Sequence, residues 1–202
     1  TLPNNYTFSG NHFLNNKALE ENRLGGKGGA IYLSADDRTD KHPKYEFRNN
    51  EFTNNYATLF GGAIYVWNTP PILTSDNIFH NNTITEDINN IGSHAVKLVL
   101  LVPETTNRRL ASFIYEPDLQ VASNFTMDNI GSTIKLVGQR MALLDMYDQV
   151  VKDDSISKLY LDVEEVLDNS QIIHAQKGIY QLNNVSFKSP PNSKVQITIK
   201  TD

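Results

Sequence analysis

One short string recurs three times in the first half of the chain and limits its fold more than any other feature. The string is a phenylalanine, any residue and two asparagines, in the segments HFLNN, EFTNN and IFHNN. A glycine-led apolar segment follows each copy: GGAIYLS from Gly28, GGAIYVW from Gly61 and a degraded GSHAVKLVLL from Gly92. Self-similarity with a period of roughly 30 residues indicates that one small structural unit is built repeatedly.

Each part of the repeat suits a stacked β-coil. The phenylalanines are expected to point inward and stack on one another. Asparagine tolerates left-handed turns, and its amide can bond to the amide of the next coil. A glycine pair suits a sharp corner where a side chain would collide with the neighbouring coil. The residues that we assign to this framework are Phe13, Asn16, Gly28, Gly29, Phe52, Asn55, Gly61, Gly62, Phe79 and Asn82.

The first half therefore predicts a right-handed parallel β-helix, a solenoid of short strands. No segment within residues 1–102 shows the apolar spacing of an amphipathic helix. The polar insert 34–46 is interpreted as a loop. The third copy departs from the pattern at Gly92, so we expect it to be the capping coil.

The second half follows a different pattern. Alternating polar and apolar residues in STIKLVG, SKLYLDVEEV, GIYQLNNVSFKS and SKVQITIKTD predict antiparallel strands of an Ig-like β-sandwich. The segment MALLDMYDQVV is interpreted as a strand with its turn in preference to a short helix. We therefore predict an all-β chain with two domains, 1–104 and 105–202.

Composition limits the function. Of 202 residues 39% are hydrophobic and 20% charged, as in a globular protein, and the net charge of -5 disfavours nucleic acid and anionic membranes as partners. The longest apolar run, AVKLVLLV at 95–102, is too short to span a bilayer. The absence of cysteine excludes disulfides and thiolate metal sites. Because the chain begins at Thr1, we interpret it as a processed product or a segment of a longer protein.

Four Asn-x-Ser/Thr sequons predict N-linked glycans and an extracellular or cell-surface location. They begin at Asn5, Asn81, Asn124 and Asn184.

Few residues suggest chemistry. The best catalytic or calcium-binding candidates are Asp36, Asp37, Arg38, Asp40, Lys41 and His42, and a solvated loop is the favoured interpretation. The pair Asp153 and Asp154 suits a turn better than a calcium site. The five histidines lack metal-ligand spacing, and His12 and His80 are expected to face outward. We therefore expect no cofactor, no metal and no catalytic residue.

Two further motifs have structural alternatives. The segment LGGKGGA superficially suggests a phosphate-binding loop, but it lacks the Gly-Lys-Ser/Thr element and fits a solenoid corner better. Tyr32, Tyr65 and Trp67 could form an exposed aromatic stripe for glycans. Alternatively, Tyr32 and Tyr65 stack on each other outside the coils while Ile31 and Ile64 point inward.

The Phe-x-x-Asn and Gly-Gly-Ala-Ile motifs resemble the repeat of chlamydial polymorphic outer-membrane proteins, which form surface-exposed β-helices. Phe13 with Asn16, Phe52 with Asn55, and residues 28–31 and 61–64 carry this resemblance. The combination with the second half, notably residues 178–197, is similar to large ciliate surface proteins with Ig-like sandwiches. The resemblance implies a role in surface architecture.

The sequence thus favours a non-catalytic extracellular structural protein, a segment of a larger surface or filament-forming glycoprotein that assembles end to end. Its expected partners are copies of itself or neighbouring domains of the same long chain, together with N-linked glycans and surface polysaccharide. The alternatives are a carbohydrate-active enzyme, a polysaccharide lyase or hydrolase on a β-helix, and a glycan-binding adhesin.

Overall fold

The computed structural model describes most of the chain. The described residues are 5–21, 24–35, 43–85, 87–101, 112–114, 123–129, 133–136, 140–152, 154–163, 171–182, 185–188 and 193–201. The chain divides into two compact units, Thr1–His94 and Ala95–Asp202. The predicted domain boundary between residues 104 and 105 falls in 102–111, outside the described residues.

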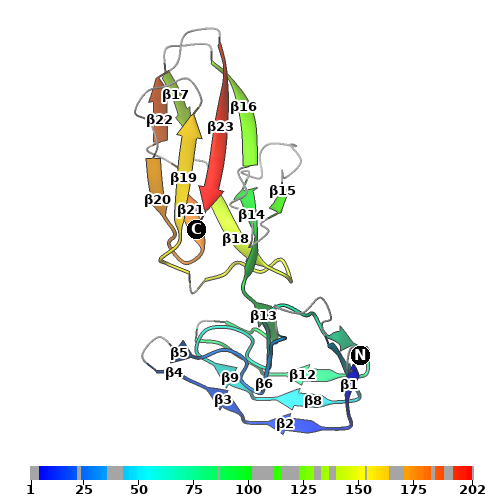
Figure 1. Cartoon of the computed structure of the whole chain (residues 1–202). Helices are drawn as coiled ribbons and strands as arrows, with labels where there is room; N and C mark the ends of the chain where they lie inside the picture. Colours follow the sequence, from blue (N-terminus) through cyan, green and yellow to red (C-terminus); the bar gives the residue numbers. More distant parts are fainter. Residues whose placement is uncertain are drawn as a thin grey trace. The chain divides into compact units, whose positions relative to one another are not determined.

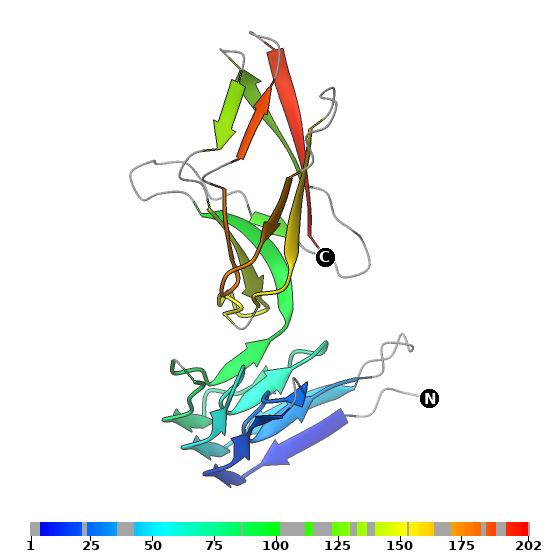
Figure 2. The ribbon, with the colours of Figure 1, turned by 90° about the vertical axis from the view of Figure 1, so that its left-hand side faces the viewer.

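The first unit is a solenoid-like stack of three coils with three parallel sheets (Figures 1 and 2). One sheet contains β1 (Asn5–Ser9), β7 (Lys44–Arg48) and β11 (Ile72–Leu73). The second contains β2 (His12–Leu14), β8 (Glu51–Thr53) and β12 (Ile78–His80). The third contains β6 (Ile31–Leu33), β10 (Ile64–Val66) and β13 (Ile91–Ser93). We call the coils that begin with β1, β7 and β11 coil 1, coil 2 and coil 3.

Each sheet has a strand of coil 2 in its centre, so coil 2 supplies most of the core. Among its buried residues are Phe47, Phe52, Phe60, Ile64 and Tyr65. Shorter pairs complete the unit: β3 (Lys17–Ala18) runs parallel to β9 (Tyr56–Ala57), and β4 (Glu20–Glu21) runs antiparallel to β5 (Leu24–Gly25). The prediction of parallel stacked strands is confirmed.

The sheet β1–β7–β11 was missed by the sequence prediction, which assigned only two strands to each coil. Its second strand, β7, begins at Lys44, inside the insert 34–46 that was expected to be a loop. The burial of Phe47 explains why the chain is extended here, because alternate residues of β7 face the core.

The third glycine-led segment was also placed in the wrong register. Ile91, not a residue after Gly92, pairs with Ile64, and Gly92 pairs with Tyr65. The backbone of Gly62 donates to the carbonyl of Asn89 at 2.7 Å, so an asparagine occupies the place expected for a glycine. The segment AVKLVLL leaves the coil altogether, because β14 (Ala95–Leu101) pairs antiparallel with β18 (Arg140–Asp145).

The second unit consists of antiparallel sheets, as predicted. One sheet has the order β15 (Ser112–Ile114), β14, β18 and β21 (Ile179–Gln181). Another has the order β16 (Ser123–Asn129), β23 (Ser193–Thr201), β19 (Lys158–Val163) and β20 (Gln171–His174). A pair is formed by β17 (Thr133–Leu136) and β22 (Val185–Lys188). The Ig-like assignment stays a prediction.

Buried side chains of both four-stranded sheets include Met141, Leu159, Leu161, Tyr180 and Ile199. The segment MALLDMYDQVV forms strand β18 and a turn, so its interpretation as a strand is confirmed. Strands β15, β16 and β20 were not predicted from the sequence.

Candidate functional site: the asparagine ladders

The second asparagine of each repeat forms a ladder, which we call ladder B, through the stack. The backbone N–H and the Nδ2 of Asn16 both donate to Oδ1 of Asn55, at 3.0 and 2.9 Å. Asn55 Nδ2 donates in return to the carbonyl of Phe13 at 2.8 Å. The next step repeats these bonds: the N–H and Nδ2 of Asn55 donate to Asn82 Oδ1 at 3.1 and 2.9 Å, and Asn82 Nδ2 donates to the carbonyl of Phe52 at 2.9 Å. The predicted bonding between coil amides is confirmed.

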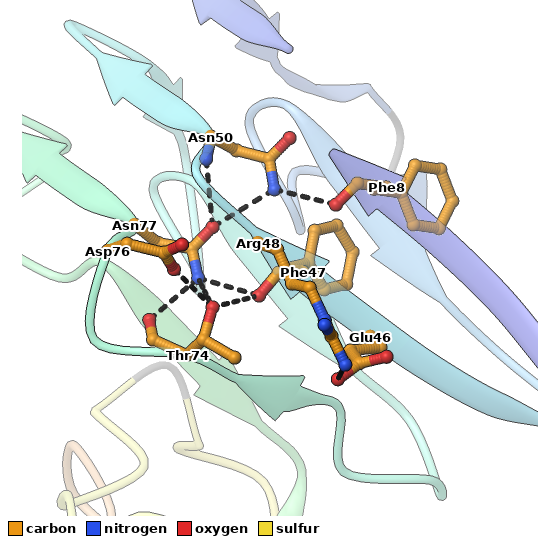
Figure 3. A network of polar contacts seen from close by, with 8 residues as sticks. All are labelled: Phe8, Glu46, Phe47, Arg48, Asn50, Thr74, Asp76 and Asn77. Atoms are coloured by element: carbon orange, nitrogen blue, oxygen red, sulfur yellow. Dashed lines mark hydrogen bonds and ion pairs between the residues drawn. The ribbon is translucent and has the colours of Figure 1, made fainter. Parts of the chain in front are cut away.

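A second ladder, ladder A, lies at the other end of the β2–β8–β12 strands. Asn11 donates from N–H and Nδ2 to Asn50 Oδ1, both at 3.0 Å, and Asn50 donates likewise to Asn77 Oδ1 at 3.1 and 3.0 Å. Figure 3 shows the second of these steps, with Asn50 Nδ2 also reaching the carbonyl of Phe8 at 2.9 Å. The sequence analysis missed this ladder. Its signal was present as an asparagine two residues before each repeat phenylalanine.

The asparagines divide two tasks between them. The first asparagine of each pair has the left-handed backbone conformation, with φ of 56° at Asn15, 56° at Asn54 and 52° at Asn81. The second asparagine carries the ladder, and Asn55 and Asn82 are completely buried. Buried amides need partners, and the ladders supply them, so each coil is held in one register against the next.

Aromatic rings stack beside the ladders. Phe13 and Phe52 lie 4.7 Å apart between ring centroids, and Phe52 and Phe79 lie 4.9 Å apart, with interplanar angles of 8° and 5°. Phe8 and Phe47 form a second stack at 4.7 Å. The predicted stacking of the three repeat phenylalanines is confirmed. Dry aromatic columns and amide ladders are the combination that stabilises stacked β-structures.

The glycine pairs also divide two tasks. Gly28 and Gly61 have positive φ, 71° and 63°, which favours glycine. A Cβ on Gly29 would lie 2.1 Å from the carbonyl oxygen of Gly62, and one on Gly62 would lie 2.6 Å from that of Asn89. The predicted collision with the neighbouring coil is thus confirmed at the second glycine of each pair, and LGGKGGA is a solenoid corner followed by strand β6.

The two ends of the ladders differ. At coil 3, Asn82 Nδ2 donates to Oδ1 of Asn90 at 3.1 Å, and Asn77 Nδ2 donates to the carbonyl of Thr74 at 2.8 Å. These bonds close both ladders within the unit. At coil 1, Asn11 and Asn16 are exposed, and no described residue donates to either Oδ1. We call this surface the open end.

Charged side chains occupy the outer surface of the coils. His12 Nδ1 lies 2.9 Å from Glu51 Oε2, and the Thr53 hydroxyl donates to Glu51 Oε1 at 3.0 Å. Thr53 first and His12 second hold the pKa of the Glu51 carboxyl below its usual value. His12 and His80 are exposed, so their predicted outward orientation is confirmed. These groups link neighbouring coils across the outside of the sheet.

The exposed aromatic stripe suggested for glycan binding is interrupted, because one of its three residues is buried. Tyr32 and Tyr65 do stack, with centroids 5.1 Å apart, but Tyr65 is completely buried while Tyr32 is 51% exposed. Lys27 Nζ lies 5.1 Å from the centroid of the Tyr65 ring. Trp67 packs against the His94 ring at 4.9 Å. The three aromatic residues therefore do not present one continuous exposed face.

Of the other residues suggested as catalytic or calcium-binding, the structure describes only Asp154. Asp36, Asp37, Arg38, Asp40, Lys41, His42 and Asp153 lie outside the described residues. Asp154 closes a turn, because its Oδ1 accepts from the backbone of Ile156 and Ser157 at 3.1 and 2.9 Å. The described part of the chain contains no cluster of metal-ligating side chains. Nor does it contain a helix that could span a membrane.

The sequons lie in different settings. Asn5 begins strand β1 and is exposed, and Asn81 is exposed at the left-handed turn after β12. Asn124 lies in β16 opposite Thr198. Asn184 lies outside the described residues.

A buried carboxylate in the second unit was also missed by the sequence analysis. Asp145 is completely buried, and its Oδ1 accepts from the backbone N–H groups of Tyr147 and Gln149 at 2.8 and 2.9 Å. Burial, with a smaller contribution from Asp145, raises the pKa of Tyr147 to about 12. The hydrogen bonds to the Asp145 carboxylate stabilise the turn after β18.

The fold and the ladders define a class: a β-solenoid of short asparagine-rich repeats, joined to a second unit of antiparallel sheets. Two segments, residues 13–34 and 51–66, match the model of the Chlamydia polymorphic membrane protein repeat. The resemblance seen in the sequence is thereby shown for these repeats, which are typical of outer-membrane or surface proteins. No curated protein and no solved structure matches the chain.

Proposed function

We propose that this chain is a non-catalytic structural unit of a larger extracellular surface or filament-forming glycoprotein, in which repeat units join end to end. The observation that carries the proposal is the repetition of one set of three hydrogen bonds at each of the two steps of both ladders. A set that repeats without change can be continued, and stacking coils are the usual basis of extended repeat proteins.

The placement of the polar residues that recur in each repeat supports the same role. Asn50, Asn55 and Asn82 are buried between coils, where the Nδ2 of each donates to a backbone carbonyl of the preceding coil. The polar repeat positions therefore serve the stack. An exposed sequon such as Asn81 suits a glycoprotein, because a glycan there can extend into solvent.

Surface labelling of intact cells of the source organism tests this function. Antibodies raised against the chain should label cells that have not been permeabilised, and glycopeptide mapping should find glycan at Asn5 and Asn81. Labelling only after permeabilisation would overturn the surface role. Cleavage of acidic or neutral polysaccharides by the purified chain, with or without calcium, would overturn the non-catalytic role.

A further inference from the structure

The open end at coil 1 has a defined hydrogen-bonding chemistry. Between coils 1 and 2, each asparagine of coil 1 donates twice to an Oδ1 of coil 2 and each asparagine of coil 2 donates once to a carbonyl of coil 1. Three bonds in each of two ladders make six at this step. The next step, from coil 2 to coil 3, repeats all six.

The same pattern applied to coil 1 defines what would fit on it. At coils 2 and 3, the Oδ1 of each ladder asparagine accepts from a backbone N–H and an Nδ2 of the preceding coil. The Oδ1 atoms of Asn11 and Asn16 occupy the equivalent positions of coil 1. Phe8 and Phe13 are half-buried, each with a ring stacked on coil 2. The surface therefore offers two paired acceptors and two aromatic faces in a fixed order.

The strand edge completes this surface. β1, β2 and β6 each lie at the edge of their sheet. The N–H of Asn15 donates to coil 2, to the carbonyl of Thr53 at 3.0 Å, so alternation along a parallel strand directs the N–H of Leu14 away from coil 2. An edge strand with outward N–H and C=O groups is a template for a further strand.

We propose that the open end binds one further parallel strand with the sequence Asn-x-Phe-x-Asn-Asn, supplied by another repeat domain. This inference rests on the proposed end-to-end function and gives it a direction. A strand of this sequence brings an N–H and an Nδ2 to each of Asn11 and Asn16, and its phenylalanine continues the Phe13 column. At coil 3 the corresponding amide donors, those of Asn77 and Asn82, are already bonded within the unit.

A second copy of this chain does not supply the same donors. Its coil 3 end has Asn82 Nδ2 bonded to Asn90 and Asn77 Nδ2 bonded to Thr74. Its coil 1 end presents the same Oδ1 acceptors, and the backbone N–H and one N–H of each Nδ2 of Asn11 and Asn16 are used toward coil 2. The complement is therefore a repeat strand whose asparagine donors are free.

A peptide from coil 2 is the natural probe, because coil 2 already makes these contacts on one side. Fluorescein-labelled peptide 45–60, YEFRNNEFTNNYATLF, contains both ladder asparagines of that coil, Asn50 and Asn55, and both stacked phenylalanines, Phe47 and Phe52. We expect saturable binding to the full chain by fluorescence anisotropy. The same peptide with Asn50→Asp and Asn55→Asp keeps its size and acceptor oxygens but loses the Nδ2 donors, and it should bind at least about tenfold more weakly.

Variants of the protein locate the contact. Leu14→Pro removes the outward N–H at an edge position where proline is tolerated, so peptide binding should fall at least about tenfold. Leu14→Ala keeps that N–H and should bind as the unchanged chain does. Thermal unfolding of both variants shows whether the fold is retained.

Three results would overturn the inference: no binding of the coil 2 peptide, equal binding of the aspartate peptide, or self-association of the chain that the peptide displaces. Surface labelling is read separately. Labelled cells without peptide binding would overturn only this inference, whereas unlabelled intact cells would overturn the proposed function as well.

Discussion

At the residue scale, the two asparagines of each repeat look alike in sequence and differ in task. Asn54 is exposed and adopts φ of 56°, whereas Asn55 is completely buried and bonds to both neighbouring coils. The sequence predicted both tasks for the pair. It did not indicate which asparagine performs which, because that depends on the direction of the chain at the corner.

Substitution separates the two tasks. Asn55→Ala removes four hydrogen bonds: two from Asn16, one to the carbonyl of Phe13 and one to Oδ1 of Asn82, which keeps only the bond from the backbone N–H of residue 55. We therefore expect the free energy of unfolding to fall by about 3 kcal/mol or more. Asn54→Ala only strains a left-handed position and should cost about 1 kcal/mol. Urea unfolding followed by circular dichroism compares the two. Equal losses would contradict the ladder's role.

Tyr147 predicts a dependence on alkaline pH in the second unit. Its pKa is raised to about 12 by burial, and its hydroxyl has no hydrogen-bond partner among the described residues. An unfolded tyrosine ionises near pH 10, roughly, so this stabilisation is complete below pH 10 and is lost as the pH rises through about 12.

The measurement compares Tyr147→Phe with the unchanged chain in urea unfolding at several pH values between about 9 and 12. The free energy of unfolding of the unchanged chain should decline more steeply, because phenylalanine does not ionise. Tyr65 and Tyr180 remain in both proteins, so their ionisation cancels in the comparison. If both proteins lost stability equally with pH, the pKa of the Tyr147 hydroxyl would not be raised in the folded protein.

At the element scale, the distance between coils is set by glycine. A Cβ on Gly62 would meet the carbonyl oxygen of Asn89 at 2.6 Å and the backbone N of Thr83 at 2.6 Å. Gly62→Ala should therefore lower the free energy of unfolding by about 3 kcal/mol, because the backbone of coil 3 would have to shift to make room for the added methyl group.

Gly10→Ala is the matched control. Gly10, unlike Gly62, has a positive φ, 67°, and nothing lies within 4 Å of its added Cβ. Its substitution should cost only the backbone strain, about 1 kcal/mol. Both values come from urea unfolding, and a Gly62→Ala variant as stable as Gly10→Ala would mean that the coils stack less closely than described.

The strands show how far sequence alone can reach. Phe13, Phe52 and Phe79 were identifiable because the spacing from the phenylalanine to the asparagine pair is the same in all three copies of the motif. Strand β7 was hidden, because its apolar residues follow a polar insert of a length that the other coils lack. In coil 3 the corner is marked by Asn89 and not by glycine, so the register depended on hydrogen bonds that no motif records.

At the scale of the whole molecule, a linear stack predicts graded protection. Each coil contacts only its neighbours, so coil 2 is held on two sides and coil 1 on one. Hydrogen–deuterium exchange with mass spectrometry should show slower exchange in residues 44–66 than in residues 5–18. Equal exchange in the two segments would indicate that the first unit opens as a single cooperative body.

The sequence also predicted the change from parallel to antiparallel strands, because the repeat motif stops and alternation begins. It assigned Ala95–Leu101 to the wrong side of that change. An apolar run with few polar residues fits a coil strand and a sheet strand equally well, and only its antiparallel partner β18 distinguishes them.

Disulfide trapping tests the order of the coils most directly, since the chain has no cysteine of its own. Thr53 lies opposite Leu14 on coil 1 and opposite His80 on coil 3. On oxidation, Leu14→Cys with Thr53→Cys should form an intramolecular disulfide, seen as faster migration on a non-reducing gel. Leu14→Cys with His80→Cys should not, because strands two coils apart are separated by roughly twice the 4.8 Å strand spacing, beyond disulfide reach. Efficient trapping of the second pair, or none of the first, would contradict the stack.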